Sequence, residues 1–369
     1  MIGWYAIGVL GLALLMIVHE AGHFFAARAY GMRVTRFSIG FGPAFFKVYP
    51  NNGWFWLSTA AGRITLRLWR HDPAKHGPTE FQVAMIPFLA YVQIAGMNPL
   101  EDIDPRDKGS YANASLIGRV VTIFGGPLAN YLFASVLFFA SFVFGGRVFR
   151  PTEVSVLEGR PAAVANIKDG DVILEIGGVK VAEWDEMADV IAKSPDRELT
   201  VVIKRGDEQV TTKVLPTNEG GRGKIGVKLR GEPRRVPVTV GEAAKLSVLM
   251  PPTVVRDLVI GIGQYLTGKA EGELAGPAGI VKETARAAKS GWTDLLYFLG
   301  ALSAYLGAFN LIPFPALDGG RLMFLGYEAA TRRRPNARIE AQVHAIGLVM
   351  MLGLMAYVTF VNDFRLGFK

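Results

Sequence analysis

Hydrophobic residues gather in four long runs along the chain, and polar residues fill the segments between them. The runs cover residues 1–18 with a continuation towards residue 30, residues 120–146, residues 295–317 and residues 345–361. A helix needs roughly 17 to 25 mainly apolar residues to cross a bilayer. The pattern therefore predicts an α-helical multi-pass membrane protein with four transmembrane helices. We expect the first helix to be retained, because it lacks the basic start and the small-residue cleavage site of a signal peptide.

The loops that follow the first and third runs are rich in arginine. The first loop contains Arg28, Arg36 and Arg70, and the second contains Arg321 and the arginines at 332–334. Basic residues concentrate in cytoplasmic loops. We therefore expect both loops in the cytoplasm, and both termini and the segment 150–290 outside. The net charge of +8 is spread over these loops and forms no basic domain, which favours a bilayer over nucleic acid as partner.

The external segment has the patterns of a small α+β domain. "DVILEIGGVKV" predicts two strands joined by a Gly-Gly turn, residues 182–194 have helical spacing, and a second hairpin turns at 205–208. The expected organisation is a membrane domain at 1–149, this domain at 150–230, amphipathic membrane-surface helices at 231–291 and a second membrane domain at 292–369. Pro251 and Pro252 are expected to break one of the surface helices.

A β-hairpin is expected just after the first span, at residues 37–70. In "RITLRLW" the side chains alternate, with Ile64, Leu66 and Leu68 on one side, and "FSIGFGP" and "NNGWF" supply turn residues. An ordinary cytoplasmic hairpin and a functional one fit this pattern equally well.

Two histidines and a glutamate end the first hydrophobic run. In "HEAGH", His19 and His23 are four residues apart, so a helix places both imidazoles on one face, where they can share a zinc ion. Glu20 would then lie beside the metal and accept a proton from its water. Chance recurrence is the alternative, but polar residues are costly in a membrane helix and tend to be functional. The chain has no cysteine, so a metal site must use histidines and carboxylates.

A catalytic zinc usually has three protein ligands, and "HEAGHFFAARA" offers no third one nearby. Asp318 is the favoured candidate. It follows the third run, which by the topology above reaches the same depth as the first, and Pro313 and Pro315 would unwind the helix there. A simple cytoplasmic loop residue remains the alternative for Asp318, and His71 and His76 in a polar loop are rival ligands.

Taken together, these motifs resemble the site-2 protease family of intramembrane zinc metalloproteases, most closely its bacterial regulator of sigma-E protease branch. "HEAGHFFAARAYGMRVTRFSIGFGP", "FGGPLAN", "GPAGI" and "NLIPFPALDGG" carry the resemblance, which covers nearly the whole chain. It implies a zinc ion bound by His19, His23 and Asp318, with Glu20 as general base. It also implies substrate-positioning roles for Asn310 and, near the active site, Asn130. Hydrogen bonding between helices is the alternative for both asparagines.

The resemblance further implies an intramembrane protease of the bacterial inner membrane whose active site lies near the cytoplasmic side. Its expected substrates are transmembrane segments of single-pass proteins, such as anti-sigma factors or signal-peptide remnants, after a first cleavage elsewhere. The hairpin bearing Ile64, Leu66 and Leu68 is the expected substrate-binding strand, and the domain at 150–230, expected to be PDZ-like, would restrict access. Oligomeric state is left open.

The sequence departs from the family pattern at three points. "PFLAYVQIAG" lacks the usual glycine pair before the second span, Arg321 replaces the usual histidine after Asp-Gly-Gly, and only one PDZ-like unit fits. Two other functions fit the sequence less well than a protease does. A membrane metal transporter would need several intramembrane carboxylates along a path, and an inactive scaffold would have no need of Glu20.

Overall fold

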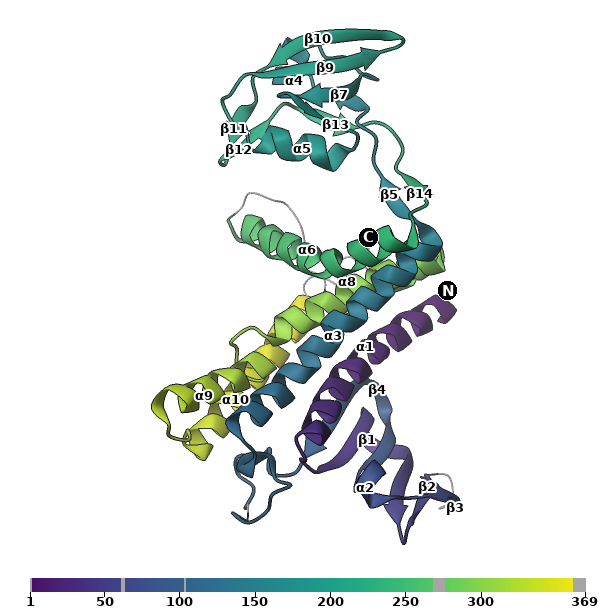
Figure 1. Cartoon of the computed structure of the whole chain (residues 1–369), viewed down its shortest axis with the longest axis vertical. Coiled ribbons are helices and arrows are strands. Elements are labelled where there is room, and N and C mark those ends of the chain that lie inside the picture. Colours follow the sequence, from purple (N-terminus) through teal and green to yellow (C-terminus); the bar gives the residue numbers. More distant parts are fainter. Residues whose placement is uncertain (1, 61–63, 103, 268–275, 361–369) are drawn as a thin grey trace. The chain divides into compact units, whose positions relative to one another are not determined.

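The computed structural model of the protein describes residues 2–60, 64–102, 104–267 and 276–360 (Figure 1). The chain folds into two compact units. We call Met1–Ser141 with Val240–Lys369 the helical unit and Phe142–Thr239 the inserted domain. The helices of the helical unit are α1 Ile2–Ala29, α2 Pro73–His76, α3 Leu116–Gly145, α6 Val240–Leu266, α7 Pro277–Ser290, α8 Trp292–Asn310, α9 Asp318–Thr331 and α10 Ala337–Val358, with a 3-10 turn η1 at Tyr111–Asn113.

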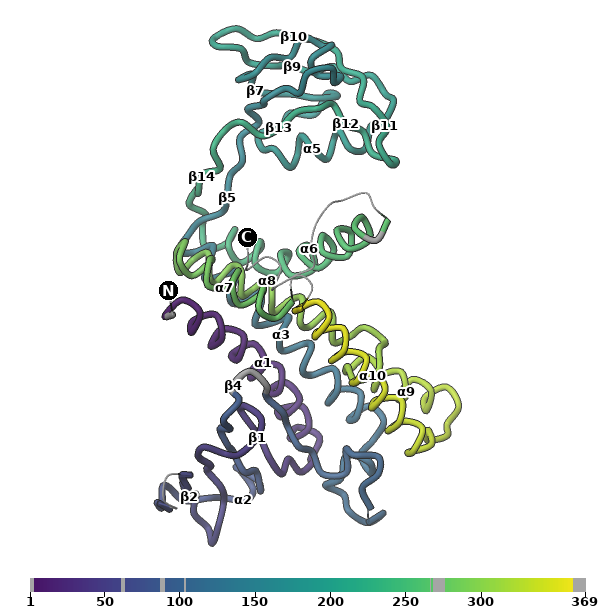
Figure 2. Tube along the Cα trace, turned by 180° about the vertical axis from the view of Figure 1, so that it is seen from behind, coloured from purple at the N-terminus to yellow at the C-terminus, as the bar shows by residue number. Residues whose placement is uncertain are grey.

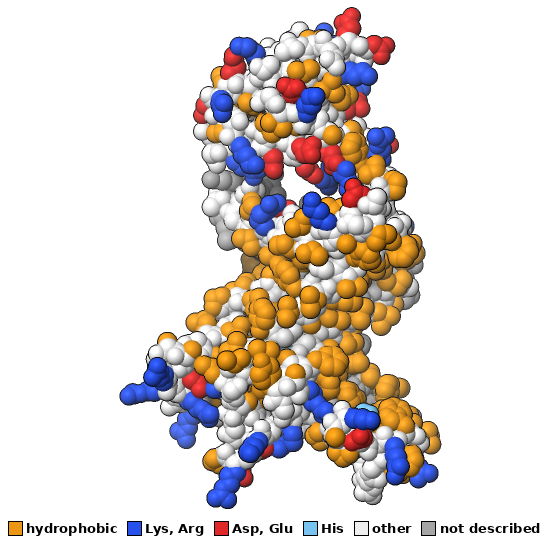
Figure 3. Space-filling view, in the orientation of Figure 1, with side chains coloured by type: hydrophobic (Ala, Val, Ile, Leu, Met, Phe, Trp, Pro, Cys, Tyr) orange, Lys and Arg blue, Asp and Glu red, His pale blue; other side chains and the backbone are white. Residues whose placement is uncertain are grey.

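Four helices among the described residues are long and apolar enough to cross a membrane. They lie in α1, α3, α6 and α10, at Gly3–Ala29, Leu116–Gly145, Val240–Tyr265 and Ala337–Val358. On the face shown in Figure 3, hydrophobic side chains gather over the middle of this helical unit. The number of helices that could span a membrane therefore equals the predicted four. Three of them coincide with predicted runs, whereas the third lies in α6 and not in the predicted run 295–317. The last residue of the predicted fourth run, Val361, lies outside the described residues.

The helix α8 occupies the place of the predicted third run and ends earlier than expected. It stops at Asn310, and residues 311–317 form an irregular loop instead of the last two turns. Prolines at 313 and 315 account for this end, because each lacks a backbone donor and restricts the preceding residue. One face of α8 is buried against other helices, with Leu299, Ala304 and Gly307 among its buried residues.

The helix α6 corrects the expectation for Pro251 and Pro252. The helix continues through both prolines from Val240 to Leu266. Each proline fixes φ close to the helical value, but it also lacks a backbone donor and crowds the carbonyl four residues earlier, so this helix forms despite a local cost at both positions. This stretch is also one of the four that could span a membrane, whereas its sequence pattern predicted a surface helix.

A β-sheet packs against α1 and replaces the expected hairpin. Its strands are β1 Val34–Asn51, β2 Trp54–Thr59, β3 Thr65–Arg70 and β4 Glu80–Ile94, in the order β3-β2-β1-β4. Both β1 and β4 bend, so each pairs twice. Residues 44–48 and 36–39 of β1 each pair with 80–84 of β4, and 34–39 also pair with 90–94. The paired segments therefore follow one another as 65–70, 54–59, 44–51, 80–84, 34–39 and 90–94.

This order corrects the prediction for residues 37–70. The region contributes three strands rather than one hairpin, and its "RITLRLW" strand, β3, lies at one edge of the sheet. The opposite edge is residues 90–94, which we call the edge segment. The bend in β1 is made possible by Gly40 and Gly42, both at a φ of 93°, where a side chain is strained. Alternation alone could not reveal that the distant stretch 80–94 completes the sheet.

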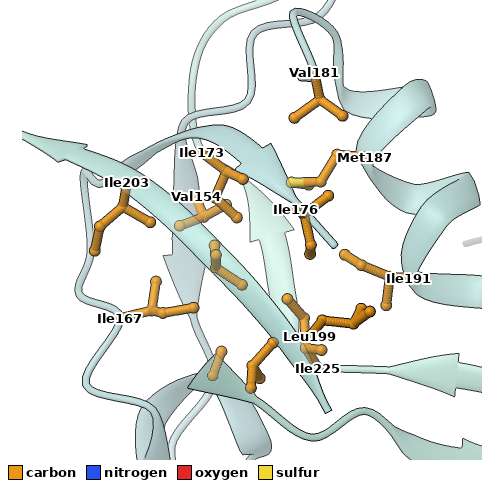
Figure 4. Close-up of a cluster of buried hydrophobic side chains, with 13 residues drawn as sticks. Val154, Ile167, Ile173, Ile176, Val181, Met187, Ile191, Leu199, Ile203 and Ile225 are labelled. Atoms are coloured by element: carbon orange, nitrogen blue, oxygen red, sulfur yellow. The ribbon is translucent and has the colours of Figure 1, made fainter. Parts of the chain in front are cut away.

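The inserted domain is a compact α+β fold. Its elements are β5 Arg147–Phe149, β6 Val154–Val156, α4 Pro161–Val164, β7 Val172–Ile176, β8 Val179–Lys180, α5 Trp184–Ala192, β9 Leu199–Arg205, β10 Glu208–Val214, β11 Thr217–Glu219, β12 Arg222–Lys224, β13 Val227–Leu229 and β14 Arg234–Val236. Both predicted hairpins and the predicted helix are confirmed, with Gly177 and Gly178 in the first turn at positive φ. Aliphatic side chains from α5 and the sheet form its core, among them Ile173, Met187 and Ile203 (Figure 4).

One buried carboxylate in the inserted domain is held ionised. Burial by itself would raise the pKa of Asp171, which is 1% exposed. The Arg205 guanidinium reverses this effect by donating two hydrogen bonds, of 2.8 and 2.7 Å, and holds the pKa of Asp171 below its usual value. The pair fixes the loop before β7 to the end of β9.

Candidate metal centre

The helices α1 and α3 approach each other closely at glycines. A Cβ on Gly22 would lie 2.1 Å from the carbonyl oxygen of Gly125, and one on Gly125 would lie 2.7 Å from that of Gly22. A Cβ on Gly126 would lie 2.4 Å from His23 Nε2 and 2.9 Å from His19 Cε1. Figure 2 shows α1 running beside α3 on one side and β4 on the other. The glycines of "FGGPLAN" therefore make room for the two imidazoles.

Three acceptor-type atoms converge at this crossing. His19 Nε2 and His23 Nε2 are 3.2 Å apart, and Asp318 Oδ2 lies 3.1 Å from the first and 3.3 Å from the second. The two histidines are buried, and Asp318 Oδ2 is a buried atom without a hydrogen-bond partner. This is the one group of three or more histidine and acidic residues, within the described parts of the chain, that is arranged to hold a metal ion.

The hydrogen bonds behind the imidazoles decide which nitrogen can bind a metal. His23 Nδ1 lies 2.8 Å from the backbone carbonyl oxygen of Thr122, which can only accept. The proton of His23 is therefore on Nδ1, and Nε2 presents a lone pair to the centre. Such a hydrogen bond to the second ring nitrogen is the usual support of a metal-binding histidine.

The triangle of ligand atoms fits a zinc ion. Tetrahedral zinc has bonds of about 2.0–2.1 Å to nitrogen and oxygen, which places neighbouring ligand atoms ~3.3 Å apart. The three observed separations are 3.1, 3.2 and 3.3 Å. A lone pair and a carboxylate oxygen at such distances repel each other unless a cation or a proton lies between them. Two histidines and one carboxylate are also a known ligand set of catalytic zinc.

Asp318 reaches this point from a loop and not from the end of a span. It is the first residue of α9, after the irregular segment 311–317 that follows α8. Gly319 and Gly320 allow this turn to close, because a Cβ on them would lie 2.1 Å from the carbonyl oxygen of Ile312 and 2.5 Å from that of Phe314. The proline-containing loop and the glycine pair thus direct the Asp318 carboxylate towards α1.

Glu20 lies on α1 between the two histidines and contacts the sheet. Its Oε2 accepts a hydrogen bond of 3.0 Å from the backbone N–H of Val92, in the edge segment. This contact joins the predicted general base to the edge of the sheet. No sequence pattern indicates the contact, because the backbone of any residue could make it, and only the pairing of residues 90–94 with 34–39 places Val92 there.

Of the other predicted site residues, Asn130 contacts the metal centre and the remaining four do not. Asn130 is fully buried, and its side-chain amide lies 3.1 Å from His19 Nδ1. Asn310 donates to the carbonyl oxygen of Leu306 in its own helix, 3.0 Å away. Ile64 precedes β3, and Leu66 lies in that strand, on the sheet edge opposite to the edge segment. Leu68 shares that strand.

The structure also shows the contacts of the rival ligands His71 and His76 and of Arg321, which replaces the usual histidine of the family. His71 and His76 pack against Phe55 of β2, with ring centroids 4.9 and 5.3 Å from the phenyl ring, and do not join the three-residue group. Arg321 donates a hydrogen bond of 3.4 Å to the carbonyl oxygen of Met97, so it ties α9 to the segment after β4.

Asn130 supports the metal centre from behind. The amide nitrogen faces His19 Nδ1, while Oδ1 is buried without a partner. Rotating the amide by 180° would let Oδ1 accept a proton from Nδ1 and would leave the His19 Nε2 lone pair for the metal. We therefore expect Asn130→Asp, which still accepts, to retain zinc, and Asn130→Ala to bind it about 10–100-fold more weakly. The affinity is measured by competition with a chelator, and equal affinities of the two variants would contradict this role.

Comparisons with known proteins agree with this site. The model of the peptidase family M50 matches residues 7–61 and 64–354. A protein of Nostoc sp. named "Putative zinc metalloprotease" is 33% identical over 93% of this chain and 91% of its own length. One of the same name from Clostridium perfringens is 30% identical, with 95% and 96% covered. One from Agrobacterium fabrum is 28% identical, with 96% and 94% covered.

Among solved structures, the PDZ domain of the SdrC-like protein of Listeria monocytogenes is 27% identical over 22% of this chain and 85% of that domain, with a TM-score of 0.19. The matching family and the site define a metalloprotease. The chain belongs to peptidase family M50, the site-2 protease family of zinc metalloproteases. The resemblance drawn from the sequence motifs is thereby confirmed.

Proposed function

We propose that this protein is an intramembrane zinc metalloendopeptidase that cleaves transmembrane segments of single-pass membrane proteins. The observation that carries the proposal is the triangle of His19 Nε2, His23 Nε2 and Asp318 Oδ2 with Glu20 beside it on the same helix as the histidines. These four residues are the ligands and the general base that peptide hydrolysis requires. The two helices that cross at this site, α1 and α3, are apolar enough to lie within a bilayer.

We place the site near the cytoplasmic face of a bacterial inner membrane. His19 is the eighteenth residue of α1, which corresponds to about 27 Å along a helix and therefore to the inner edge of a ~30 Å hydrocarbon core. Lys and Arg side chains gather at the end of the helical unit that carries the α9–α10 turn and the sheet, as the positive-inside rule requires of a cytoplasmic face (Figure 3). We take α8 and not α6 as the third span, because one face of α8 is buried against other helices whereas α6 is mostly exposed. With α1, α3, α8 and α10 crossing the membrane, the inserted domain is periplasmic.

The chemistry divides among four side chains. Zinc bound by His19, His23 and Asp318 would polarise the scissile carbonyl and acidify a water molecule. Glu20 takes the proton from the attacking water and returns it to the leaving amine. The Val92 N–H fixes the Glu20 carboxylate at the border between the metal centre and the sheet.

A helical substrate must be extended before it can be cut, because its carbonyls are hydrogen-bonded within the helix. We propose that the edge segment binds the extended substrate by adding it as a further strand. Successive residues of a strand point their N–H groups to opposite sides, so Ala90 shares the outward direction of Val92. Ala90 therefore offers its N–H and carbonyl oxygen to a substrate strand next to Glu20.

Removal of one outward N–H tests this strand. Ala90→Pro is expected to lower cleavage about tenfold or more, because it deletes a main-chain hydrogen bond to the substrate, and to leave zinc binding unchanged. The matched control is Leu66→Ala in β3, on the other edge, which should leave cleavage unchanged. If Leu66→Ala lowers cleavage and Ala90→Pro does not, the substrate binds β3, the strand predicted from the sequence, and not the edge segment.

The function itself is tested by metal analysis of the purified protein and by cleavage of a single-pass model segment in a bilayer. The expected result is one zinc per chain and cleavage within the hydrophobic segment. A metal transporter would move zinc across vesicles and leave the segment intact, and a scaffold would do neither. We further propose that natural substrates arrive already shortened by another protease, with the inserted domain restricting entry of bulkier ones.

A further inference from the structure

The loop that carries Asp318 is held by α10 as well as by its own glycines. The backbone N–H of Ala316, two residues before Asp318, donates a hydrogen bond of 3.0 Å to Nδ1 of His344 on α10. One turn further along α10, Gly347 faces Pro315 so closely that a Cβ would lie 2.3 Å from the Pro315 Cβ. The helix α10 thus touches the two residues of the loop that precede Leu317 and Asp318.

Ala316 is in an unfavourable backbone conformation. Its φ is 73°, in the left-handed region that residues with a Cβ rarely adopt. Such a conformation persists only when the surroundings determine it. The Ala316 N–H donates to the His344 side chain, so this hydrogen bond helps to fix the turn of the chain into Asp318.

The chemistry of the contact specifies the state of the imidazole. Because an N–H can only donate, His344 Nδ1 must present a lone pair, and a neutral ring then carries its proton on Nε2. His344 Nε2 is buried without a hydrogen-bond partner. The ring also lies against Phe324 of α9, with centroids 5.6 Å apart. His344 therefore has two roles that substitutions can separate: its Nδ1 accepts the Ala316 N–H, and its ring packs on α9.

We propose that His344 is a positioning residue of the metal centre. Its Nδ1 holds the Ala316 N–H and thereby aims the Asp318 carboxylate at the point shared by His19 and His23. This inference rests on the proposed zinc site, and it assigns a role to the fourth span, which supplies no ligand. Nothing in the local sequence around His344, "AQVHAIG", has the spacing of a metal-binding motif.

Three substitutions separate the acceptor from the ring. In His344→Asn, the side-chain oxygen can occupy the place of Nδ1, whereas His344→Phe keeps a ring against Phe324 and has no acceptor. We expect His344→Phe and His344→Ala to lose zinc to a chelator about tenfold faster than the wild type, as the loss of contacts that support metal ligands usually weakens binding. His344→Asn should stay close to the wild-type rate. Gln342→Ala, at an exposed position two residues away on the same helix, is the matched control.

The experiment uses the full-length protein in bilayer nanodiscs, loaded with zinc, and follows zinc loss and thermal unfolding together. If His344→Phe retains zinc while His344→Asn loses it, the ring and not the acceptor matters, and the proposal is wrong. Equal zinc loss from all variants, the control included, would also overturn it. A wild type that binds no zinc would instead remove the proposed function, so the two failures are distinguishable.

Discussion

Glu20→Gln is expected to stop peptide cleavage while leaving zinc in place. The substitution keeps the shape of the side chain and removes the proton acceptor, and general base catalysis contributes about 10²–10⁴-fold to such rates. Zinc should remain because the three converging atoms belong to His19, His23 and Asp318 and not to Glu20. The introduced amide can still accept the Val92 N–H through its side-chain oxygen, so the contact of α1 with the edge segment is preserved.

The measurement is the initial rate of cleavage of a single-pass segment, with zinc content determined on the same preparation. Glu80→Gln is a suitable control, because Glu80 lies in the same sheet and pairs with Arg36 and Lys47. The Glu80→Gln variant should cleave the segment at close to the wild-type rate. Cleavage that survives Glu20→Gln, with zinc bound, would show that another group accepts the proton and would remove Glu20 from the mechanism.

Asp318→Asn is expected to abolish zinc binding and, with it, cleavage. An amide has the shape of a carboxylate but no charge, and it leaves two neutral imidazoles to hold a dication. The loss of affinity should exceed the roughly 10–100-fold that removal of a supporting hydrogen bond costs. The fold should survive, because Asp318 Oδ2 makes no hydrogen bond that holds α9 in place.

A general loosening of α9 must be distinguished from the loss of a ligand. Glu328→Gln serves this purpose, because Glu328 accepts two hydrogen bonds from Arg119, of 2.8 and 2.6 Å, and ties the end of α9 to the start of α3. This variant should unfold at a lower temperature and still bind zinc. If Asp318→Asn binds zinc as tightly as the wild type, the third ligand is another group, and the proposed site is wrong.

Much of the local structure could be predicted from short patterns. The spacing of His19 and His23 is enough to put both rings on one face of a helix. Both hairpins of the inserted domain follow from alternation and turn residues, and Pro313 and Pro315 mark the place where the helix before Asp318 ends. In each case the determining interactions join residues a few positions apart.

The long helix α6 and the substrate strand could not be predicted in the same way. The stretch that became α6 and the stretch that became α8 are both apolar, and hydropathy does not record that α8 is buried among other helices. The edge segment is defined by pairing with residues more than fifty positions earlier in the chain. Loop closure over such a distance depends on the bends of β1 and β4 together, which no local pattern carries.

By itself, the amino-acid sequence indicated the family and the helical character of the chain, and the family resemblance named the four residues that are proposed to bind and use a metal. Only the tertiary structure decided how those residues meet. Close packing at Gly22, Gly125 and Gly126 brings α3 against the histidines, and the hold of His344 on Ala316 sets the turn into Asp318. The physical reason is that the 3.1–3.3 Å separations of the ligand atoms depend on how the backbones pack. These packing contacts join residues up to three hundred positions apart, which no local pattern records.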